Sequence, residues 1–381
     1  MNAGRLHAVL EHIKQDYEKN EVLGRLKATV DALSASISSV TEANATAFRS
    51  ALSELYAALD RSPTASATPS ELEIINEIGA SDKVGLGLRA KIENTLDSNN
   101  VTPANALTEL QKILEVITHF QEVVLAMVDG FEALKVPYEA LEPGESEIGV
   151  LVPWAVVHSS LEGVQKELHR FDNALKVIGQ LVDDNAESPE IRSVGSSTLQ
   201  VFINSTAGIA LCFAAAIERL CALYKQILEI KLLRKQVREK CLPENVSASI
   251  EAHEQQVAEK GIDKIVDALI REFGKKRDKE RLNELRNGLR TALRFLAAQI
   301  DAGVSMEVRS EPPRARDVAE SEGEDVKSAK TKRALEEARK IAARIERAGV
   351  AMRALKRASE PILALESPVE TKKGRGKRET S

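Results

Sequence analysis

The sequence predicts a mainly α-helical protein that has a small α+β module in its middle and helical coiled-coil arms on either side. Apolar residues recur at three- and four-residue intervals over most of the 381 residues, which is the period of an amphipathic helix. Aromatic residues make up only 3% of the chain and charged residues 29%, a composition typical of long helices. Short segments near residues 148–152 and 190–204 depart from this helical period and predict strands.

The N-terminal residues 1–60 are expected to form a helical arm. Leu26 and Leu33 belong to a row of apolar residues with seven-residue spacing, which favours a seam between two helices. Residues 61–70 (RSPTASATPS) are rich in Pro, Ser, Thr and Ala, and this composition predicts a linker.

Residues 71–243 are expected to form the central α+β module. Its strands are predicted from the apolar run Ile148–Val152 and from a hairpin in which Gly195 begins the turn. Helical segments are expected near 69–79 and 86–97, followed by a helix at 104–135, a strand at 148–152 and a helix at 159–183. Strands at 190–194 and 198–204 and a long helix at 206–241 complete the module. Together they predict a small sheet with helices packed on one side.

After Pro243 the pattern is helical again, and residues 244–302 are expected to form a helical hairpin. Residues 303–326 contain two prolines and many acidic residues, so we expect a disordered acidic linker there. Residues 327–360 restart a heptad pattern that includes Ile341 and Ile345 and predict a basic amphipathic helix. Residues 361–381 are expected to be a disordered basic tail.

The charge of the chain is unevenly distributed. Its formal net charge is −5, but residues 327–381 contain 16 basic and 7 acidic residues, a net charge of +9, and the rest of the chain carries −14. Nucleic acid or another polyanion is therefore a possible partner of the tail, through weak, salt-dependent contacts. The alternative is that the tail pairs with the acidic body or only increases solubility. The candidate polyanion-binding residues are Lys372, Lys373, Arg375, Lys377 and Arg378.

We predict no catalytic residues, no cofactor and no metal site. The sequence lacks a phosphate-binding GxxxxGK[ST] loop, and Gly85-Leu86-Gly87 is better explained as a break between helices. His253-Glu254 begins like a zinc-protease helix, but Val257 stands where the second ligand is required. The three cysteines match neither a disulfide framework nor a zinc motif, so a reducing cytoplasm is the expected location.

Two features near the first predicted strand allow a functional interpretation. His158-Ser159-Ser160 could belong to a nucleophilic site, but we expect Ser159 to cap the next helix, with Glu162 three residues later as in a capping box. Trp154, the only tryptophan, could anchor a partner, although a large ring beside a buried strand is expected to pack against the helix at 159–183.

The start of the long helix also allows a membrane interpretation. Its uninterrupted apolar run, from Ala207 to Ile217, covers 11 residues, whereas a bilayer requires about 20. We therefore expect a buried core helix rather than a membrane span.

The runs LEPGESEIGVLVP (141–153) and SVGSSTLQVFINSTAGIALCFAAAIERL (193–220) resemble a recurring module of uncharacterised bacterial proteins. In that module a strand, a helix and a hairpin lead into a hydrophobic helix and a charged coiled coil. The resemblance implies a bacterial origin and carries no known activity.

The expected function is non-enzymatic assembly, either self-association or the bridging of helical protein partners through heptad seams. The rival hypotheses are nucleic-acid binding through the basic tail and, less in keeping with the sequence, a membrane-active effector. The candidate partner-binding residues are Leu26, Leu33, Leu220, Ile227, Ile341 and Ile345.

Overall fold

The computed structural model describes residues 2–184, 186, 188–239, 244–274, 279–322, 328–355 and 362–363. The chain divides into two compact units. Unit 1 comprises Met1–Glu142 together with Val194–Gln200, and unit 2 comprises Pro143–Ser193 and Val201–Ser381. The described residues contain twelve α-helices and one four-stranded antiparallel sheet, so the prediction of a mainly α fold with a small α+β module is confirmed.

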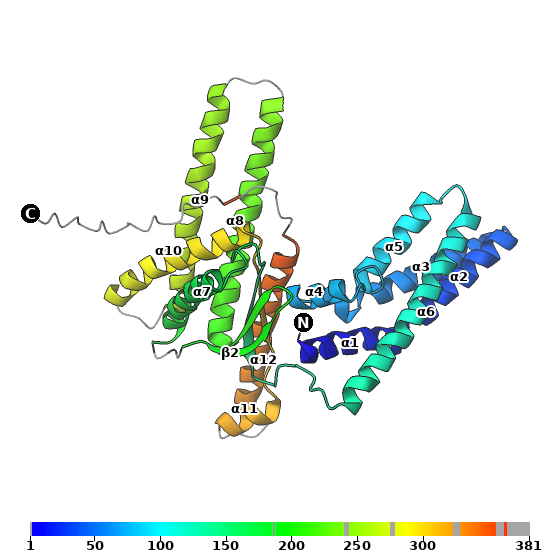
Figure 1. Ribbon diagram of the computed structural model, residues 1–381, viewed down its shortest axis with the longest axis horizontal. Coiled ribbons are helices and arrows are strands. Elements are labelled where there is room, and N and C mark those ends of the chain that lie inside the picture. Colours follow the sequence, from blue (N-terminus) through cyan, green and yellow to red (C-terminus); the bar gives the residue numbers. More distant parts are fainter. Residues whose placement is uncertain are drawn as a thin grey trace, which may run out of the picture. The chain divides into compact units, whose positions relative to one another are not determined.

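Unit 1 is helical, and α6 spans its length (Figure 1). Its apolar rows meet in one continuous core to which α1, α2, α5 and α6 contribute fully buried side chains. Pro103 stands at the first position of α6, where a missing N–H costs nothing. The elements are α1 (Ala3–Glu18), α2 (Val22–Ser38), α3 (Glu42–Asp60), the 3₁₀ turn η1 (Pro63–Ser66), α4 (Pro69–Glu77), α5 (Gly85–Ser98) and α6 (Pro103–Ala133).

The linker predicted at 61–70 is instead part of this core. Ser62 caps η1 by accepting a hydrogen bond from the Thr64 N–H, and Thr68 caps α4 in a complete capping box with Glu71. Ser62, Thr64 and Ala67 are buried. The small polar residues that indicated flexibility therefore satisfy the free amides of two helix starts.

Unit 2 contains most of the sheet, whose strand order is β2-β3-β1-β4. β1 and β4 pair antiparallel, with Ile148 opposite Val308 and Glu147 opposite Arg309. Alternate residues point to opposite faces, so most apolar residues of this pair, including Ile148 and Val308, share one face. The charged residues Glu147, Glu307 and Arg309 share the other face with Leu151. The strands are β1 (Ser146–Val152), β2 (Glu190–Gly195), β3 (Leu199–Ser205) and β4 (Ser305–Ser310).

β4 corrects the prediction of a disordered linker at 303–326. Residues 305–310 form an edge strand, and a short helix, α11, follows at Ala315–Glu322. Met306 and Val308 of β4 are buried against the sheet, which supplies the apolar contacts that the composition alone did not reveal.

The remaining helices pack around the sheet. α8 contacts β1 and β4, α12 packs along α8 and β4, and α7 pairs with α10. The α7–α10 pair includes an edge-on contact between Phe171 and Phe295, whose ring centroids are 4.8 Å apart. The helices are α7 (Leu161–Val182), α8 (Ala207–Glu239), α9 (Glu244–Phe273), α10 (Lys279–Asp301) and α12 (Ala329–Arg353).

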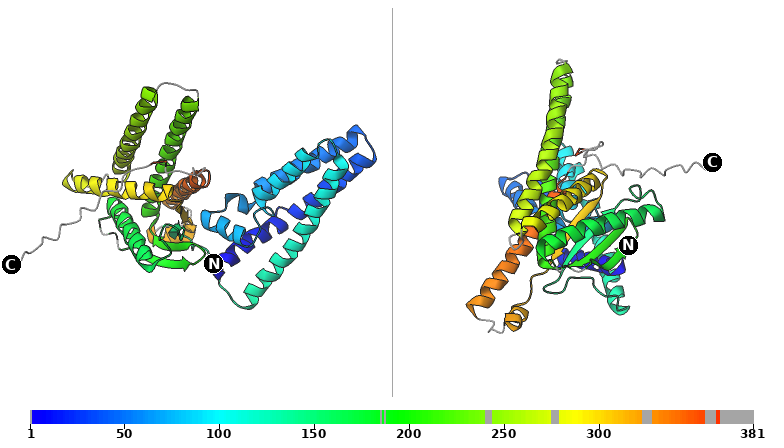
Figure 2. Two further views of the ribbon diagram at one scale, coloured as in Figure 1. Left: turned by 45° about the horizontal axis from the view of Figure 1, so that its top comes forward. Right: turned by 90° about the vertical axis from the view of Figure 1, so that its left-hand side faces the viewer.

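α8 and α9 continue beyond the sheet as a two-helix arm, which both views show (Figures 1 and 2). They approach closely because α9 has a glycine at the contact: a Cβ on Gly261 would lie 2.5 Å from a Leu223 methyl group. Within the described residues, α8 is the one helix with the length and apolarity of a membrane span, at Ala207–Leu233, and 61% of its most apolar window is buried in the protein.

Candidate protein-docking site

The predicted partner-binding residues lie inside their own units. Leu26, Leu33, Leu220, Ile227 and Ile345 are buried, and Ile341 is half-buried. The heptad rows to which they belong pack against other helices of the same chain. α2 packs against α3 and α6, and α8 packs against α9 and α12. Their binding to a partner stays a prediction, but in this conformation other surfaces are the accessible ones. The five predicted polyanion-binding residues, Lys372, Lys373, Arg375, Lys377 and Arg378, lie outside the described residues.

The β1–α7 loop, residues 153–160, is the segment in which both sequence features of interest come together. It is a stack of overlapping turns, in which the Val156 N–H donates to the Pro153 carbonyl at 2.9 Å and the Ser159 N–H donates to the Trp154 carbonyl at 3.0 Å. The Ser160 N–H donates to the Val157 carbonyl at 3.1 Å. These hydrogen bonds hold the loop in one compact conformation.

Two consecutive non-glycine residues of this loop have left-handed backbone conformations. His158 has φ 51° and Ser159 has φ 49°. Left-handed conformations cost side-chain-bearing residues about 1 kcal/mol or more each, and such positions persist only where the surrounding structure enforces them. The loop therefore stores backbone strain at an exposed position.

Ser160, not Ser159, caps α7. The Ser160 hydroxyl accepts a hydrogen bond from the Gly163 N–H at 3.0 Å and donates to the Val157 carbonyl at 3.2 Å. The prediction for Ser159 was wrong by one residue, because the left-handed Ser159 still belongs to the preceding turn.

The loop has no nucleophile–base pair in the part of the chain that the structure describes. The Ser160 hydroxyl is used in capping, and no hydrogen bond joins His158 to a serine hydroxyl or to a carboxylate. Acyl transfer requires a base within hydrogen-bonding reach of the nucleophile. The geometry of the loop therefore does not support covalent catalysis there.

Apolar side chains are exposed at both ends of the loop. Trp154 is 39% exposed and Leu161, the first residue of α7, is 84% exposed. Of the two interpretations of Trp154, packing in the core and anchoring of a partner, the observed exposure favours the second. An exposed tryptophan on a rigid loop is a common energetic centre of protein interfaces.

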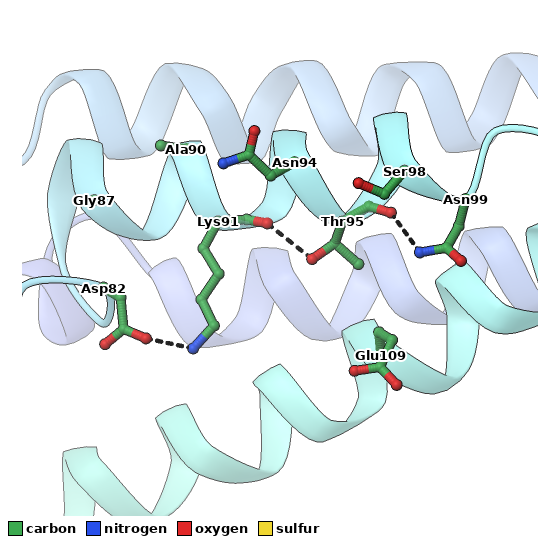
Figure 3. Close-up of a pocket in the computed structure, with 9 residues that line it drawn as sticks. All are labelled: Asp82, Gly87, Ala90, Lys91, Asn94, Thr95, Ser98, Asn99 and Glu109. Carbon is green, nitrogen blue, oxygen red and sulfur yellow. Dashed lines mark hydrogen bonds and ion pairs between the residues drawn. The ribbon is translucent and has the colours of Figure 1, made fainter.

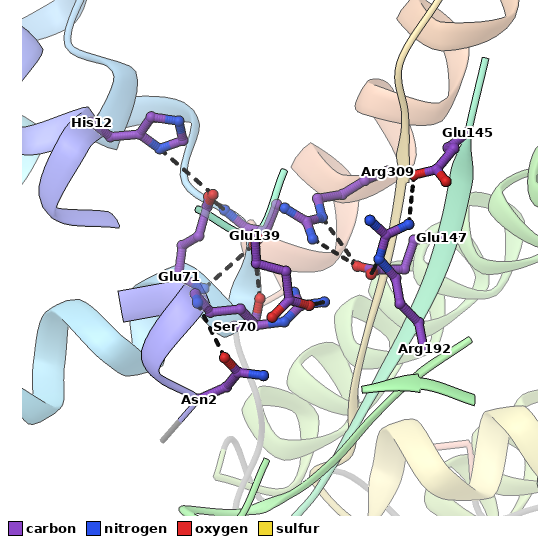
Figure 4. Close-up of polar contacts among 11 residues, drawn as sticks. Asn2, His12, Ser70, Glu71, Glu139, Glu145, Glu147, Arg192 and Arg309 are labelled. Carbon is purple, nitrogen blue, oxygen red and sulfur yellow. Dashed lines mark hydrogen bonds and ion pairs between the residues drawn. The ribbon is translucent and has the colours of Figure 1, made fainter. Parts of the chain in front are cut away.

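The charged face of the sheet holds a network that is neutralised internally (Figure 4). Glu147 is fully buried and accepts two hydrogen bonds from Arg309, at 2.8 and 3.2 Å. Arg192 lies 3.6 Å from Glu147 and donates to Glu145 at 2.7 Å. Because each guanidinium faces a carboxylate, the network explains how charge is tolerated in the sheet and does not leave an open binding site.

A shallow groove of ≈ 540 Å³ runs between α5 and α6 in unit 1 (Figure 3). Several of its polar side chains make local contacts: Lys91 pairs with Asp82 at 2.5 Å, and Thr95 and Asn99 donate to backbone carbonyls one turn earlier at 2.8 and 2.9 Å. These groups stabilise α5 and do not converge on a point where a ligand would sit.

Reactive thiols and metal sites are also missing from the described residues. Burial raises the pKa of Cys212, and it raises the pKa of Cys221 to about 12, so both are protonated thiols at neutral pH. No group of three or more His, Cys, Asp or Glu residues with the geometry of a metal site occurs among the residues that the structure describes.

A comparison with known protein families, curated proteins and solved structures finds no match to this chain. The functional argument therefore depends on the geometry above. The sequence analysis favoured core packing for Trp154 and did not select Leu161 as a candidate residue. One feature of the sequence could have drawn attention to them: they flank the His158-Ser159-Ser160 cluster that follows the first predicted strand.

Proposed function

We propose that this protein is a non-catalytic assembly protein that self-associates, with the β1–α7 loop as the docking site. The observation that supports this proposal is the exposure of Trp154, on a loop whose backbone is fixed by hydrogen bonds, and of Leu161, the first residue of the helix that follows. Preorganised apolar groups lose little entropy on binding, so they contribute more to affinity than mobile ones.

A scaffolding role also fits the helical architecture. The α8–α9 arm and the α12 helix packed on it give unit 2 long helical surfaces, as a protein that organises other chains needs. Coiled-coil pairing between copies would extend this packing from one chain to the next. A second copy of the chain is the partner to test first, because most soluble oligomers are homo-oligomers.

The sole tryptophan makes the test specific. Light scattering and Trp154 fluorescence are recorded on the full chain from about 0.1 to about 100 µM, a range that covers weak and moderate dimers. We expect the mass to rise above 41.6 kDa with concentration while the tryptophan emission shifts to shorter wavelength as its ring leaves water.

Leu161→Asp is the disrupting variant, because a carboxylate at the centre of an apolar interface is costly to desolvate. Val40→Asp is the matched control, since Val40 is also an exposed apolar residue but lies in unit 1. Leu161→Asp should stay monomeric where Val40→Asp associates as wild type does. A mass of 41.6 kDa at every concentration, with unchanged emission, rejects self-association.

A further inference from the structure

α6 carries a second apolar row, most of which the core of unit 1 does not use. Its core-facing residues, among them Leu110, Ile117 and Val124, are fully buried. On a neighbouring face of the helix, exposed fractions are 43% for Val116, 42% for Val123, 38% for Met127 and 77% for Leu134, the C-cap residue. Phe120 lies between them and is half-buried, because it also packs against the core. Isolated exposed apolar residues are ordinary, but these five form a row.

The spacing of the row is that of a helix–helix seam. Successive members are four, three, four and seven residues apart, and this alternation repeats every seven residues. From Val116 to Leu134 the row extends about 27 Å along the helix, at 1.5 Å per residue. A partner helix of about 20 residues would cover it.

One edge of the row is acidic. Glu115, Glu122 and Asp129 are exposed and are also seven residues apart, so they form a line parallel to the apolar row. α6 as a whole contains five acidic residues and one lysine. Exposed Ala126 lies between the acidic line and the apolar row, where its short side chain leaves room for long cationic side chains of a partner.

The cationic side chains near this face do not neutralise the negative charge of the acidic line. Lys112 is paired with Glu109 at 2.8 Å, and Lys83 lies over the Phe120 ring, 5.4 Å from its centroid. His119 lies 3.6 Å from Glu122, but both side chains are largely exposed, so the contact is weak. The acidic line therefore remains available to an incoming cation.

We infer that α6 docks an amphipathic helix of another polypeptide, in which an apolar heptad row is bordered by Lys or Arg at seven-residue intervals. The apolar rows would supply most of the affinity, and the charged edges would select the partner and its register. This site is independent of the β1–α7 loop and goes beyond the proposed self-association.

The test uses two synthetic 21-residue peptides with Leu in the heptad row, one bordered by Lys and its counterpart bordered by Glu. Fluorescence anisotropy with the full chain is expected to give at least about tenfold tighter binding of the Lys peptide at low salt, and the preference should decrease as salt is added. Val123→Glu should weaken binding of the Lys peptide at least about tenfold, because it places a charge within the apolar row.

The decisive variant reverses the acidic edge. Glu122→Lys combined with Asp129→Lys should reverse the preference, so that the Glu peptide binds more tightly. Asp31→Lys combined with Glu42→Lys makes the same change in net charge at exposed positions on α2 and at the start of α3, and should keep the wild-type preference. Leu161→Asp should bind the Lys peptide as wild type does. An unreversed preference in the Glu122/Asp129 variant, or wild-type affinity in Val123→Glu, overturns the inference.

Discussion

Gly163 in the first turn of α7 lies directly against the carbonyl group of Val157. A Cβ built on Gly163 would be 2.1 Å from the Val157 oxygen and 2.7 Å from its carbon, which are backbone atoms that cannot rotate away. The same carbonyl group accepts hydrogen bonds from the Ser160 N–H and the Ser160 hydroxyl. The shape of the β1–α7 loop therefore depends on the absence of a side chain at residue 163.

Gly163→Ala is expected to lower the free energy of unfolding by about 2–4 kcal/mol, because the loop must move to relieve the clash. Gly24→Ala is the control: Gly24 lies in α2 with no atom near its would-be Cβ, so alanine should raise stability there by up to about 1 kcal/mol. Urea unfolding measures both. Equal effects of the two substitutions would contradict the close packing of residue 163.

Glu272 joins three helices, since it accepts hydrogen bonds from Arg219 of α8, at 2.7 Å, and from Arg344 of α12. These bonds, first that from Arg344, hold the pKa of Glu272 below its usual value of 4.5. The ionised form of Glu272 therefore stabilises the folded state. This stabilisation is fully present above the unfolded-state pKa and is lost as the pH falls through the folded-state pKa.

Glu272→Gln should cost about 1–2 kcal/mol near neutral pH, and the difference from wild type should shrink as the pH falls below about 4. Glu336→Gln removes an exposed pair with Lys340 and should change stability by less than about 0.5 kcal/mol. Chemical denaturation over a pH series tests this. A difference that is independent of pH would exclude the ion-paired carboxylate as its cause.

The sequence predicts three strands of this fold and most of its helices, because each of these carries its own periodic pattern; α11, in the predicted acidic linker, was missed. β4 escaped prediction since only Met306 and Val308 alternate with charged residues, and those charges find their partners far along the chain: Arg309 pairs with Glu147, 162 residues away. Local composition cannot reveal such pairing. Conversely, the heptads containing Leu26 and Leu220 indicate helix contacts but not whether the partner helix belongs to the same chain.

The two proposed docking surfaces were only partly predictable for a related reason. The exposure of an apolar residue depends on whether another segment covers it after folding, and the sequence around Trp154 is also consistent with a buried side chain. α6 contains enough apolar residues for two rows, and the sequence alone does not show that only one of them is buried in the core.

Asp16 is a buried carboxyl group in unit 1 that accepts hydrogen bonds from Ser62 and from Asn20, the latter at 2.9 Å. Burial is the main cause that raises its pKa above the usual value of 3.8. The protonated form of Asp16 therefore favours the folded state. This stabilisation is fully present below the unfolded-state pKa and is lost as the pH rises through the folded-state pKa.

Asp16→Asn, which resembles the protonated acid, should therefore become more stable relative to wild type as the pH is raised from about 4 to about 7. The same change at exposed Asp31 should show no such trend. Thermal unfolding at the two pH values compares the variants, and a relative stability of Asp16→Asn that decreases with pH would show that the ionised form is the favoured one.

Half-buried Arg309 donates two hydrogen bonds to the fully buried carboxylate of Glu147 in the charged network on the sheet. Arg309→Met is expected to cost about 2–4 kcal/mol, because the buried Glu147 then loses both hydrogen bonds from the Arg309 guanidinium. Adding Glu147→Gln should restore part of that loss, since the amide carries no charge to desolvate. A double-mutant cycle measured by urea unfolding gives the coupling free energy, and additive costs of the two substitutions would show that the pair contributes nothing as a pair.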